Sequence, residues 1–381
     1  MRAFILFLIV WLVPHAGPAF AASEPVFAPV PDWVELLPSP EADPGLRDRH
    51  YQTLLVNHQS LYGAEHNDHF EQSSYLVQTT QGLQSVGDIQ LSWQPDHQDL
   101  IIHAVRIRRG ENLLDQLAAG QQFTVLRREN NLESAMLDGT LTAVMQVEGL
   151  EIGDILEVAY TIRRRGGALP LRGENYFTLP SSYPYGRYRV REIWPTSMQM
   201  QWNGRGRFEG PQVRRTRLGT ELVVDLSDVE LPPPPEQAPA RYVFPDTLQL
   251  TEFREWSEVS RLLAPHYAQA SSLGAESPLR PQVDRIAAAS ADPRVRAMAA
   301  LRLVQEDIRY FALFMGDGNY LPATADQTWA RRYGDCKGKT LTLLAVLRAL
   351  GIEAEPVLVH SSLGDSLPER LPQLLLFDHV I

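Results

Sequence analysis

A single cysteine at the start of a long apolar segment constrains the fold of this chain more than any other feature. Cys336 is the only cysteine among 381 residues. Residues 341–350 have the length and hydrophobicity of a buried helix, with Asp335 as its N-cap and Gly351 just past its end. The first N–H groups of a helix lack intrahelical acceptors and favour a thiolate. Cys336 is therefore either a nucleophile or a small core residue.

A histidine at the end of a second apolar segment could supply the base that a thiol nucleophile needs. His379 follows the apolar, strand-like residues 374–377, and residues 355–360 form an earlier extended stretch. The order helix, strand, strand can bring Cys336 and His379 face to face. The imidazole would then take the thiol proton and return it to a leaving amine. A structural histidine with a satisfied hydrogen bond is the alternative.

Three motifs resemble the core of bacterial transglutaminase-like proteins, which have the papain-like cysteine fold. They are Arg-Tyr-Gly-Asp-Cys-Lys-Gly-Lys at 332–339, Leu-Leu-Ala-Val-Leu-Arg-Ala-Leu-Gly-Ile at 343–352 and Phe-Asp-His-Val-Ile at 377–381. Residues 308–311 and 318–322 resemble the approach to the cysteine in the same proteins. This resemblance covers residues 251–381 and implies that Cys336 and His379 are a catalytic pair.

Three positions depart from the pattern of that family. Asp378 stands where asparagine is usual, and Gly338 stands where an acidic residue is usual, in a helical turn where glycine costs ~1 kcal/mol. The orienting aspartate of the family lies on a later strand, beyond Ile381, so no residue here is assigned that role, although Asp365 or Asp378 could replace it. We therefore expect an incomplete cysteine domain with little acyl-transfer activity, which self-associates through an exposed sheet edge.

Residues 51–231 have the pattern of a β domain. Leu156, Val158 and Tyr160 alternate with more polar neighbours, which indicates a strand with one buried face. Many such strands with turns between them predict an antiparallel β-sandwich. The strand-like segments are 75–80, 100–108, 122–127, 141–147, 155–163, 187–194 and 221–226. Residues 153–162, Gly-Asp-Ile-Leu-Glu-Val-Ala-Tyr-Thr-Ile, resemble the domain of unknown function DUF3857, which usually precedes a transglutaminase-like core. The predicted fold class is α+β.

The remaining segments set the predicted domain boundaries. Residues 1–21 have the charged, apolar and small-residue regions of a secretory signal peptide, with a short inner-membrane anchor as the alternative. Residues 22–50 are rich in proline and acidic residues and are expected to run extended over the surface. Residues 232–250 begin with four prolines and are expected to form a stiff linker before the cysteine domain at 251–381.

The apolar residues change to a helical period after this linker. Asp292 and Pro293 predict the start of a helix. Its apolar positions are Val295, Met298, Leu301, Val304, Ile308 and Phe311. Trp256 marks a helical lead-in to the same domain. Helices before the cysteine and strands after it are the order that a papain-like core requires.

Composition and charge limit the partners of this chain. The net charge of −11 argues against nucleic-acid binding by phosphate neutralisation. The arginine runs 163–165 and 214–215 are expected to be solvated strand ends. The signal peptide predicts a periplasmic or secreted protein with no integral membrane segment after cleavage. One cysteine cannot form an intrachain disulfide.

Two weaker candidates concern metal binding and the wall of the thiol site. His58, His66, His69 and Asp68 are residue types that bind zinc. Their spacing matches no closed site, so we expect a hydrated loop there and neither a metal nor another cofactor. Trp329 could form one wall of the site or donate its indole N–H to an oxyanion. Packing under the sheet is the alternative for Trp329.

These features predict an exported transglutaminase-like protein that transfers or hydrolyses the acyl groups of a peptide or protein substrate. Cys336 would attack a peptide or carboxamide carbonyl, N–H groups at the helix start would stabilise the tetrahedral anion, and His379 would carry the proton. Two alternatives stay open. One is a non-catalytic envelope binding or scaffold protein, and the other is an inactive fragment of a longer enzyme.

Overall fold

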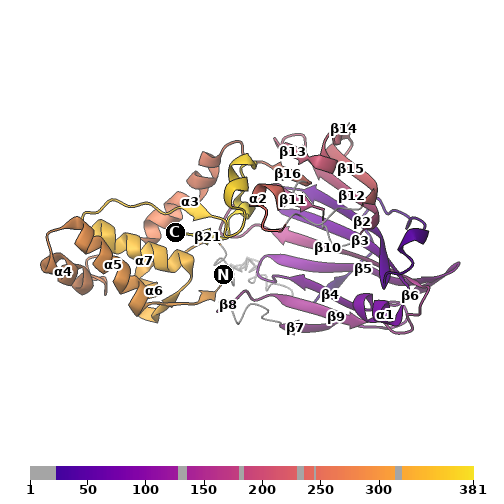
Figure 1. Cartoon of the computed structure of the whole chain (residues 1–381), viewed down its shortest axis with the longest axis horizontal. Helices are drawn as coiled ribbons and strands as arrows, with labels where there is room; N and C mark the ends of the chain where they lie inside the picture. Colours follow the sequence, from indigo (N-terminus) through magenta and orange to yellow (C-terminus); the bar gives the residue numbers. More distant parts are fainter. Residues whose placement is uncertain (1–22, 128–134, 180–183, 230–235, 244–245, 314–319) are drawn as a thin grey trace, which may run out of the picture.

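The computed structural model describes residues 23–127, 135–179, 184–229, 236–243, 246–313 and 320–381. The predicted signal peptide at 1–21 and the prolines at 232–235 lie outside these residues. A β domain at 23–251 is followed by a mainly helical C-terminal domain at 252–381, so the fold combines α and β elements (Figure 1). In the described part of the chain, no helix has both the length and the hydrophobicity that a membrane span needs.

A nine-stranded sheet forms the centre of the β domain. Its strands lie in the order β1 (Val26–Phe27), β5 (Gln98–Arg109), β10 (Ile155–Arg165), β3 (His66–Val77), β2 (Tyr51–Tyr62), β12 (Tyr185–Trp194), β15 (Gly219–Val229) and β14 (Gln212–Thr216), and β6 (Asn112–Asp115) pairs with β5. The β1–β5 and β12–β2 pairs are parallel. The sheet is therefore mixed, not antiparallel as predicted, because the chain crosses into another sheet before it returns as β12.

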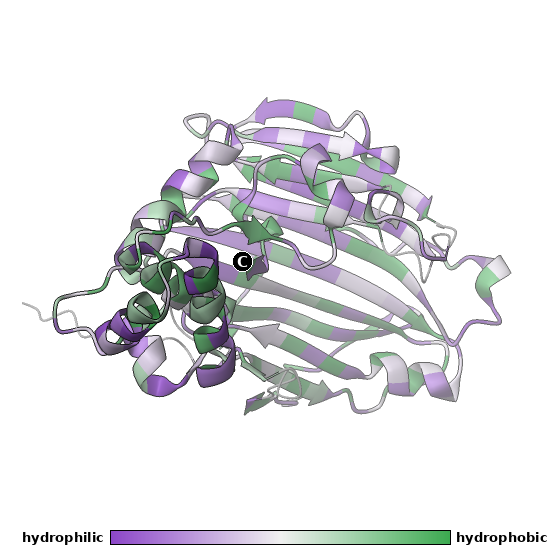
Figure 2. Ribbon diagram, turned by 60° about the vertical axis from the view of Figure 1, so that its left-hand side comes forward, coloured by the Kyte–Doolittle hydropathy of each residue, from purple (hydrophilic) through white to green (hydrophobic). Residues whose placement is uncertain are grey.

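Two small sheets cover one face of this large sheet and complete a two-layered arrangement. The first contains β4 (Asp88–Trp93), β9 (Leu141–Gln146) and β7 (Thr124–Arg127), and the second contains β11 (Glu174–Thr178), β16 (Thr247–Thr251) and β13 (Gln201–Arg205). Trp93 of the first packs with Ile102 and Leu156, whereas Leu250 of the second packs with Val190. Figure 2 shows hydrophobic and hydrophilic residues alternating along the strands, as the sequence pattern predicts for a half-buried sheet.

Strand β16 corrects the predicted domain boundary. The sequence predicts a linker at 232–250, but Thr247–Thr251 is the middle strand of the second small sheet, between β11 and β13. All five residues of β16 are buried. The pattern failed here because a central strand is set by its two neighbours, which lie far away in the sequence.

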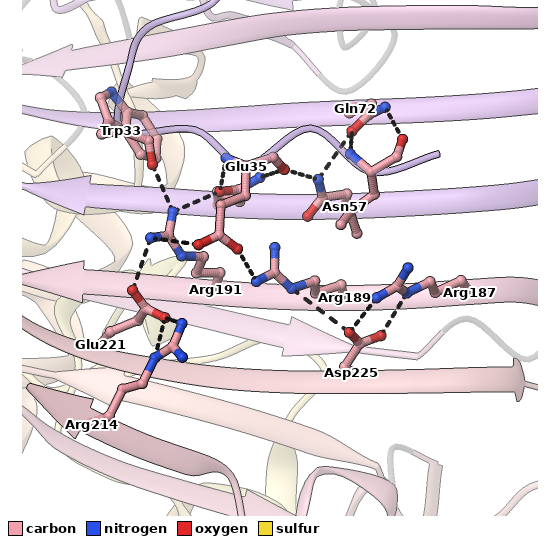
Figure 3. Close-up of polar contacts among 12 residues, drawn as sticks. Trp33, Glu35, Asn57, Gln72, Arg187, Arg189, Arg191, Arg214, Glu221 and Asp225 are labelled. Carbon is pink, nitrogen blue, oxygen red and sulfur yellow. Dashed lines mark hydrogen bonds and ion pairs between the residues drawn. The ribbon is translucent and has the colours of Figure 1, made fainter. Parts of the chain in front are cut away.

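The N-terminal segment lies across the other face of the large sheet. Residues 23–48 are largely extended, as the sequence predicts, and bond to the sheet through side chains rather than as a long strand. The amide of Asn57 donates to the Glu35 carbonyl at 3.1 Å, and Gln72 exchanges hydrogen bonds with the backbone of Leu37 at 2.8 and 3.1 Å (Figure 3). Side-chain contacts therefore hold the segment around residues 35–37, and the short β1–β5 pairing holds it at residues 26–27.

Three arginines of β12, Arg187, Arg189 and Arg191, lie under this segment and form ion pairs with carboxylates. Arg191 is 4% exposed and lies 2.8 Å from Glu221, 3.3 Å from Glu35 and 2.7 Å from the Trp33 carbonyl (Figure 3). Burial tends to raise the pKa of Glu221, but hydrogen bonds from Arg191 and Arg214 outweigh it, so the pKa is lowered. Both charges are thus paired in the interior, where an unpaired charge would be strongly destabilising. The run 214–215 is therefore not merely a solvated strand end.

A strip of polar residues separates the two apolar cores on the inner face of the sheet. The Tyr62 hydroxyl lies 2.5 Å from Glu192, Ser60 lies 3.0 Å from His69, and His58 lies 3.5 Å from Glu71. Burial raises the pKa of Glu192 to about 7 and lowers that of His69 to about 4. The histidines thus belong to β2 and β3, not to a hydrated loop.

The residues considered for metal binding do not gather into a metal site in the described part of the chain. Asp68 accepts two hydrogen bonds from Arg163, at 2.7 and 2.8 Å, and His66 lies 3.8 Å from the same carboxylate. Among the residues that the structure describes, no three or more His, Cys, Asp or Glu side chains are grouped so that they could hold a metal ion.

Replacing Glu192 by glutamine is expected to remove part of the pH dependence of stability. The folded-state pKa of about 7 lies above the unfolded value of about 4.3, so the stabilisation is complete below about pH 4.3 and is lost as the pH rises through 7. The parent should therefore lose up to about 3 kcal/mol relative to Glu192→Gln between about pH 4.5 and 8. Urea unfolding across this range measures the difference, and parallel pH profiles would contradict the prediction.

The C-terminal domain is built around one buried helix. Its helices are α3 (Trp256–Ala270), α4 (Arg280–Ala289), α5 (Pro293–Asp307), α6 (Ala325–Arg331) and α7 (Cys336–Ala349). Short strands pair between them: β17 (Arg309–Tyr310) with β19 (Tyr333–Gly334), and β20 (Leu358–Val359) with β21 (His379–Val380). Helix α7 packs against α5 and α6. A Cβ atom at Gly338 would lie 2.9 Å from Thr328 of α6, so this close packing explains the glycine that departs from the family pattern.

Two apolar segments of this domain differ from the sequence prediction. Helix α5 begins after Asp292, but Val295 and Met298 are each 51% exposed, and its buried face is formed by Ala300, Leu303 and Val304. The second segment is the run before His379, where Leu374–Leu376 is a 3-10 helix and only His379–Val380 is a strand. The N–H groups of Leu374 and Leu375 donate to the carboxylate of Glu174 in the β domain, at 2.8 and 3.4 Å. These hydrogen bonds take the place of those that a neighbouring strand would make.

Candidate active site around Cys336

Cys336 and His379 line the same pocket, which has a volume of about 280 Å³. Tyr267, Tyr320 and Phe377 form apolar parts of its wall. The β domain contributes Gln94, Met136 and Asp138 to the opposite part of the wall. The pocket therefore lies between the two domains and is lined by a thiol, an imidazole and both polar and apolar surfaces, a combination found in small-molecule and peptide sites.

Cys336 is the first residue of α7, and its surroundings oppose ionisation. Asp335 is the N-cap and accepts a hydrogen bond from the Gly338 N–H at 2.8 Å. Burial raises the pKa of the Cys336 thiol, the charge of Asp335 also raises it, and the charge of Lys337 and the N–H groups of Lys337 and Val380 lower it less. Burial thus opposes the thiolate that a helix start favours, and the charge of Lys337, which is bonded to Asp335, offsets burial only in part.

His379 is placed next to α7 by the short sheet that follows the helix. It pairs with Val359, and the edge is extended by backbone hydrogen bonds between Val357 and Ile381 at 2.8 and 3.0 Å. The hydroxyl of Thr340 in α7 donates to the Val380 carbonyl at 3.3 Å. Strand β21 therefore lies along the first turns of α7, which brings His379 to the pocket that contains Cys336.

The other acidic candidates make contacts away from the imidazole. Asp378 accepts from the Ser361 N–H at 2.8 Å and from its hydroxyl at 2.5 Å, and it lies 3.7 Å from His360. Burial tends to raise the Asp378 pKa, but the Ser361 bonds lower it overall. Asp365 pairs with Arg241 of helix α2 (Ala240–Val243). Asp378 therefore stabilises the turn after β20, and Asp365 stabilises the contact with α2.

Trp329 lies in the helical core and does not form the pocket wall in the described structure. It is buried with residues of α5 and α7, and the Arg332 guanidinium stacks 3.7 Å from the centre of its ring. Trp329 is thus a packed core residue, although it packs among helices rather than under the sheet. Tyr310 interacts with the start of α7: burial raises the pKa of its hydroxyl, and a hydrogen bond from the Cys336 N–H lowers it less.

The β domain anchors the segment that carries His379. The Gln373 side chain donates to the Leu250 carbonyl of β16 at 2.8 Å and accepts from Gln249 at 2.8 Å. Glu174 of β11 accepts from the Leu374 N–H at 2.8 Å. Burial raises the pKa of Glu174. Sequence analysis missed these residues, whose only signal is a polar side chain inside an otherwise apolar segment.

A second contact joins the domains at the pocket itself. Strand β8 (Met136–Leu137) pairs in parallel with β18 (Ala312–Leu313), and the Ala312 N–H donates to the Ala135 carbonyl at 2.8 Å. Ala135 has a φ of 55°, a left-handed conformation that is unfavourable for a residue other than glycine. The docked segment carries Met136 and Asp138 into the wall of the pocket.

Comparisons with known proteins support the assignment of the first domain. Residues 65–233 match the family DUF3857, described as a domain of unknown function with solved structure. No curated protein matches the chain. A solved structure from Parabacteroides distasonis, described as a "putative protease", superposes with a TM-score of 0.65 at 15% sequence identity. The match covers 82% of this chain and 61% of that one, and such low identity shows the fold alone. Residues 65–233 of this chain are a DUF3857 domain.

Proposed function

We propose that the chain acts on peptide or carboxamide bonds by acyl transfer through Cys336, within a papain-like C-terminal domain. The observation that carries this proposal is the pocket of about 280 Å³ that Cys336 and His379 line together. The description of the structurally similar P. distasonis protein as a "putative protease" is consistent with it. Hydrolysis and transfer to an amine share the first step, so both belong to the proposal.

The first step joins the substrate to the protein. As the Cys336 sulfur attacks the carbonyl carbon, the thiol proton passes to His379, and the leaving amine or ammonia then takes that proton as the tetrahedral anion collapses to a thioester. Because burial raises the thiol pKa, His379 acts as a general base during attack and does not hold a preformed thiolate. Water or an amine next attacks the thioester carbonyl, and the thiol is restored.

The start of α7 is suited to stabilise the charge that develops on the carbonyl oxygen. The Lys337 N–H is close enough to the thiol to lower its pKa, so it can also point toward an oxyanion formed there. The partial positive charge of the helix N-terminus adds to this effect. Tyr267, Leu358 and Phe377 form an apolar part of the pocket wall, and a low local dielectric constant strengthens such interactions.

A non-catalytic binding protein is the second candidate, and one observation favours it. Burial raises the pKa of Cys336, which is typical of a structural thiol. In that case the pocket would bind a peptide without reacting, and the large sheet would serve as a scaffold. The two candidates differ in how fast the folded protein is acylated.

Acylation of the folded chain by a blocked peptide p-nitrophenyl ester tests the proposal. The folded parent should acquire one acyl group at Cys336, detected by mass spectrometry of the digested protein, faster than the same chain in urea. Catalysis is expected because His379 and the helix N–H groups act only in the folded state. Cys336→Ala is the control for acylation elsewhere. A folded chain that is acylated more slowly than the unfolded one would favour the non-catalytic candidate.

A further inference from the structure

The N-terminal segment, residues 23–48, lies on the large sheet as a bound peptide would. None of its own residues is buried, whereas Asn57 and Gln59 beneath it are fully buried and Arg191 is 4% exposed. We propose that this face of the sheet is a binding site for an extended acidic peptide, which the N-terminal segment of a second copy of the chain can occupy in exchange for the chain's own. The proposal does not depend on the function proposed for Cys336.

Three glutamine side chains of the sheet hold the main chain of the segment. Each accepts a hydrogen bond from the N–H of one residue and donates one to the carbonyl of the same residue, at 2.7–3.1 Å. The pairs are Gln59 with Glu35, Gln72 with Leu37 and Gln52 with Asp43. Two strands exchange the same two bonds when their residues pair in an antiparallel ladder. The face therefore recognises an extended backbone through side chains.

The side chains of the segment also match this face. Trp33 packs against a small cluster that contains the buried ring of Phe70. The Glu35 carboxylate accepts a hydrogen bond from Arg189 of β12 at 2.6 Å (Figure 3). Residues 23–46 contain five acidic residues and no lysine or arginine, so their charge is opposite to that of the arginines of β12. The site thus fits an extended peptide that has an aromatic residue two positions before an acidic one.

The segment can leave its own sheet with the loss of only a short strand pairing. That pairing is limited to Val26–Phe27, and the joint at residues 47–50 is exposed. Six prolines among residues 23–46 restrict the free segment, so less conformational entropy is lost when it binds again. The sequence that the structure shows to fit this site is that of the chain itself. Two copies that exchange their segments would make the same contacts as one, at a cost that falls as the protein concentration rises.

Cross-linking between two different copies tests the exchange. The hydroxyl groups of Ser39 and Ser74 lie 2.9 Å apart, so thiols at these positions would be neighbours whenever the segment is bound. A Ser39→Cys chain is mixed with a Ser74→Cys chain, each with Cys336 replaced by alanine. The mixture is treated with dibromobimane, which becomes fluorescent when it joins two neighbouring thiols. A fluorescent heterodimer is expected, and its share should rise with the total protein concentration.

Two further chains in the same Cys336→Ala background are the controls. A Ser85→Cys chain mixed with the Ser39→Cys chain measures random collisions, since Ser85 is exposed on α1 (Thr80–Val86) and its hydroxyl bonds within that helix. The Ser74→Cys mixture should give at least about tenfold more heterodimer, because binding holds the two thiols at a high local concentration. A chain that carries both Ser39→Cys and Ser74→Cys should cross-link internally. Internal cross-linking without an excess of heterodimer would overturn the proposal, and a lack of internal cross-linking would contradict the site itself.

A synthetic peptide of residues 30–46 identifies what the site binds. It should compete with the exchanged segment and lower the share of heterodimer. The same peptide with Trp33→Ala and Glu35→Lys should compete at least about tenfold less well, because aromatic and charged anchors commonly dominate such binding. Equal competition by both peptides would overturn the proposed recognition. If the unaltered peptide blocked internal cross-linking while mixed chains formed no heterodimer, the site would bind free peptides and the second copy would be excluded as its partner.

Discussion

Replacing His379 by alanine is expected to lower kcat/KM for a peptide or carboxamide substrate by about 100-fold or more, the usual contribution of a general base. The effect should be large because burial raises the pKa of Cys336 and leaves the thiol protonated at neutral pH. Without the His379 imidazole, the proposed acceptor of the thiol proton would be missing as the sulfur attacks. The variant should keep the fold of the parent, since β21 is held by backbone hydrogen bonds.

His360→Asn is the matched control for this experiment. His360 lies in the turn directly after β20, where its Nδ1 accepts the N–H groups of Ser362 and Leu363, each at 3.0 Å. Asparagine can accept similar bonds, so this variant removes an imidazole near the site without removing the proposed base. With the same substrate, kcat/KM of His360→Asn should stay near that of the parent and exceed that of His379→Ala by about 100-fold or more. If both variants retained the activity of the parent, His379 would not be the base.

Replacing Arg191 by methionine is expected to destabilise the β domain by about 3–5 kcal/mol, as is usual when one partner of a buried ion pair is removed. Glu221 is 1% exposed, and among the described residues the cationic contact that remains without Arg191 is Arg214, which is 62% exposed. The Trp33 carbonyl and Gln59 would also lose a donor. The free energy of unfolding, obtained from urea titrations, measures the effect.

Arg187→Met provides the comparison within the same strand. Arg187 makes two hydrogen bonds to Asp225, at 2.9 and 2.7 Å, but both side chains are about one third exposed. Exposed ion pairs contribute about 1 kcal/mol or less, so this variant should lose far less stability. Similar losses in both variants would show that burial of the Arg191 network contributes little.

The parts of the molecule that the sequence predicts are those with local causes. The alternation of Leu156, Val158 and Tyr160 identifies β10, because period two reports the two faces of a strand. Asp335 and the apolar run after Cys336 identify α7, because caps and helical hydrophobicity are encoded within a few residues. His379 could be placed near Cys336 from the sequence because the motif at 377–381 resembles that of the family, not because any local pattern predicts the contact.

The features that the sequence does not reveal depend on contacts between distant segments. Burial raises the pKa of Cys336, an effect that the position at a helix start does not reveal. Asp138 reaches the pocket from the segment after β8, which pairs with β18 at a separation of 176 residues. No pattern within residues 135–138 predicts that they pair with β18.

The middle position of β16 has a consequence for how the chain is made. During synthesis β11 and β13 leave the ribosome before Thr247–Thr251, the strand that must insert between them. Until then their facing edges have no partner, and unpaired strand edges are sites where nascent chains associate. The match to DUF3857 ends at residue 233, before this strand is reached. The unit that folds is therefore longer than the unit that the family describes, and a gene fragment cut at the family boundary would encode a sheet without its centre.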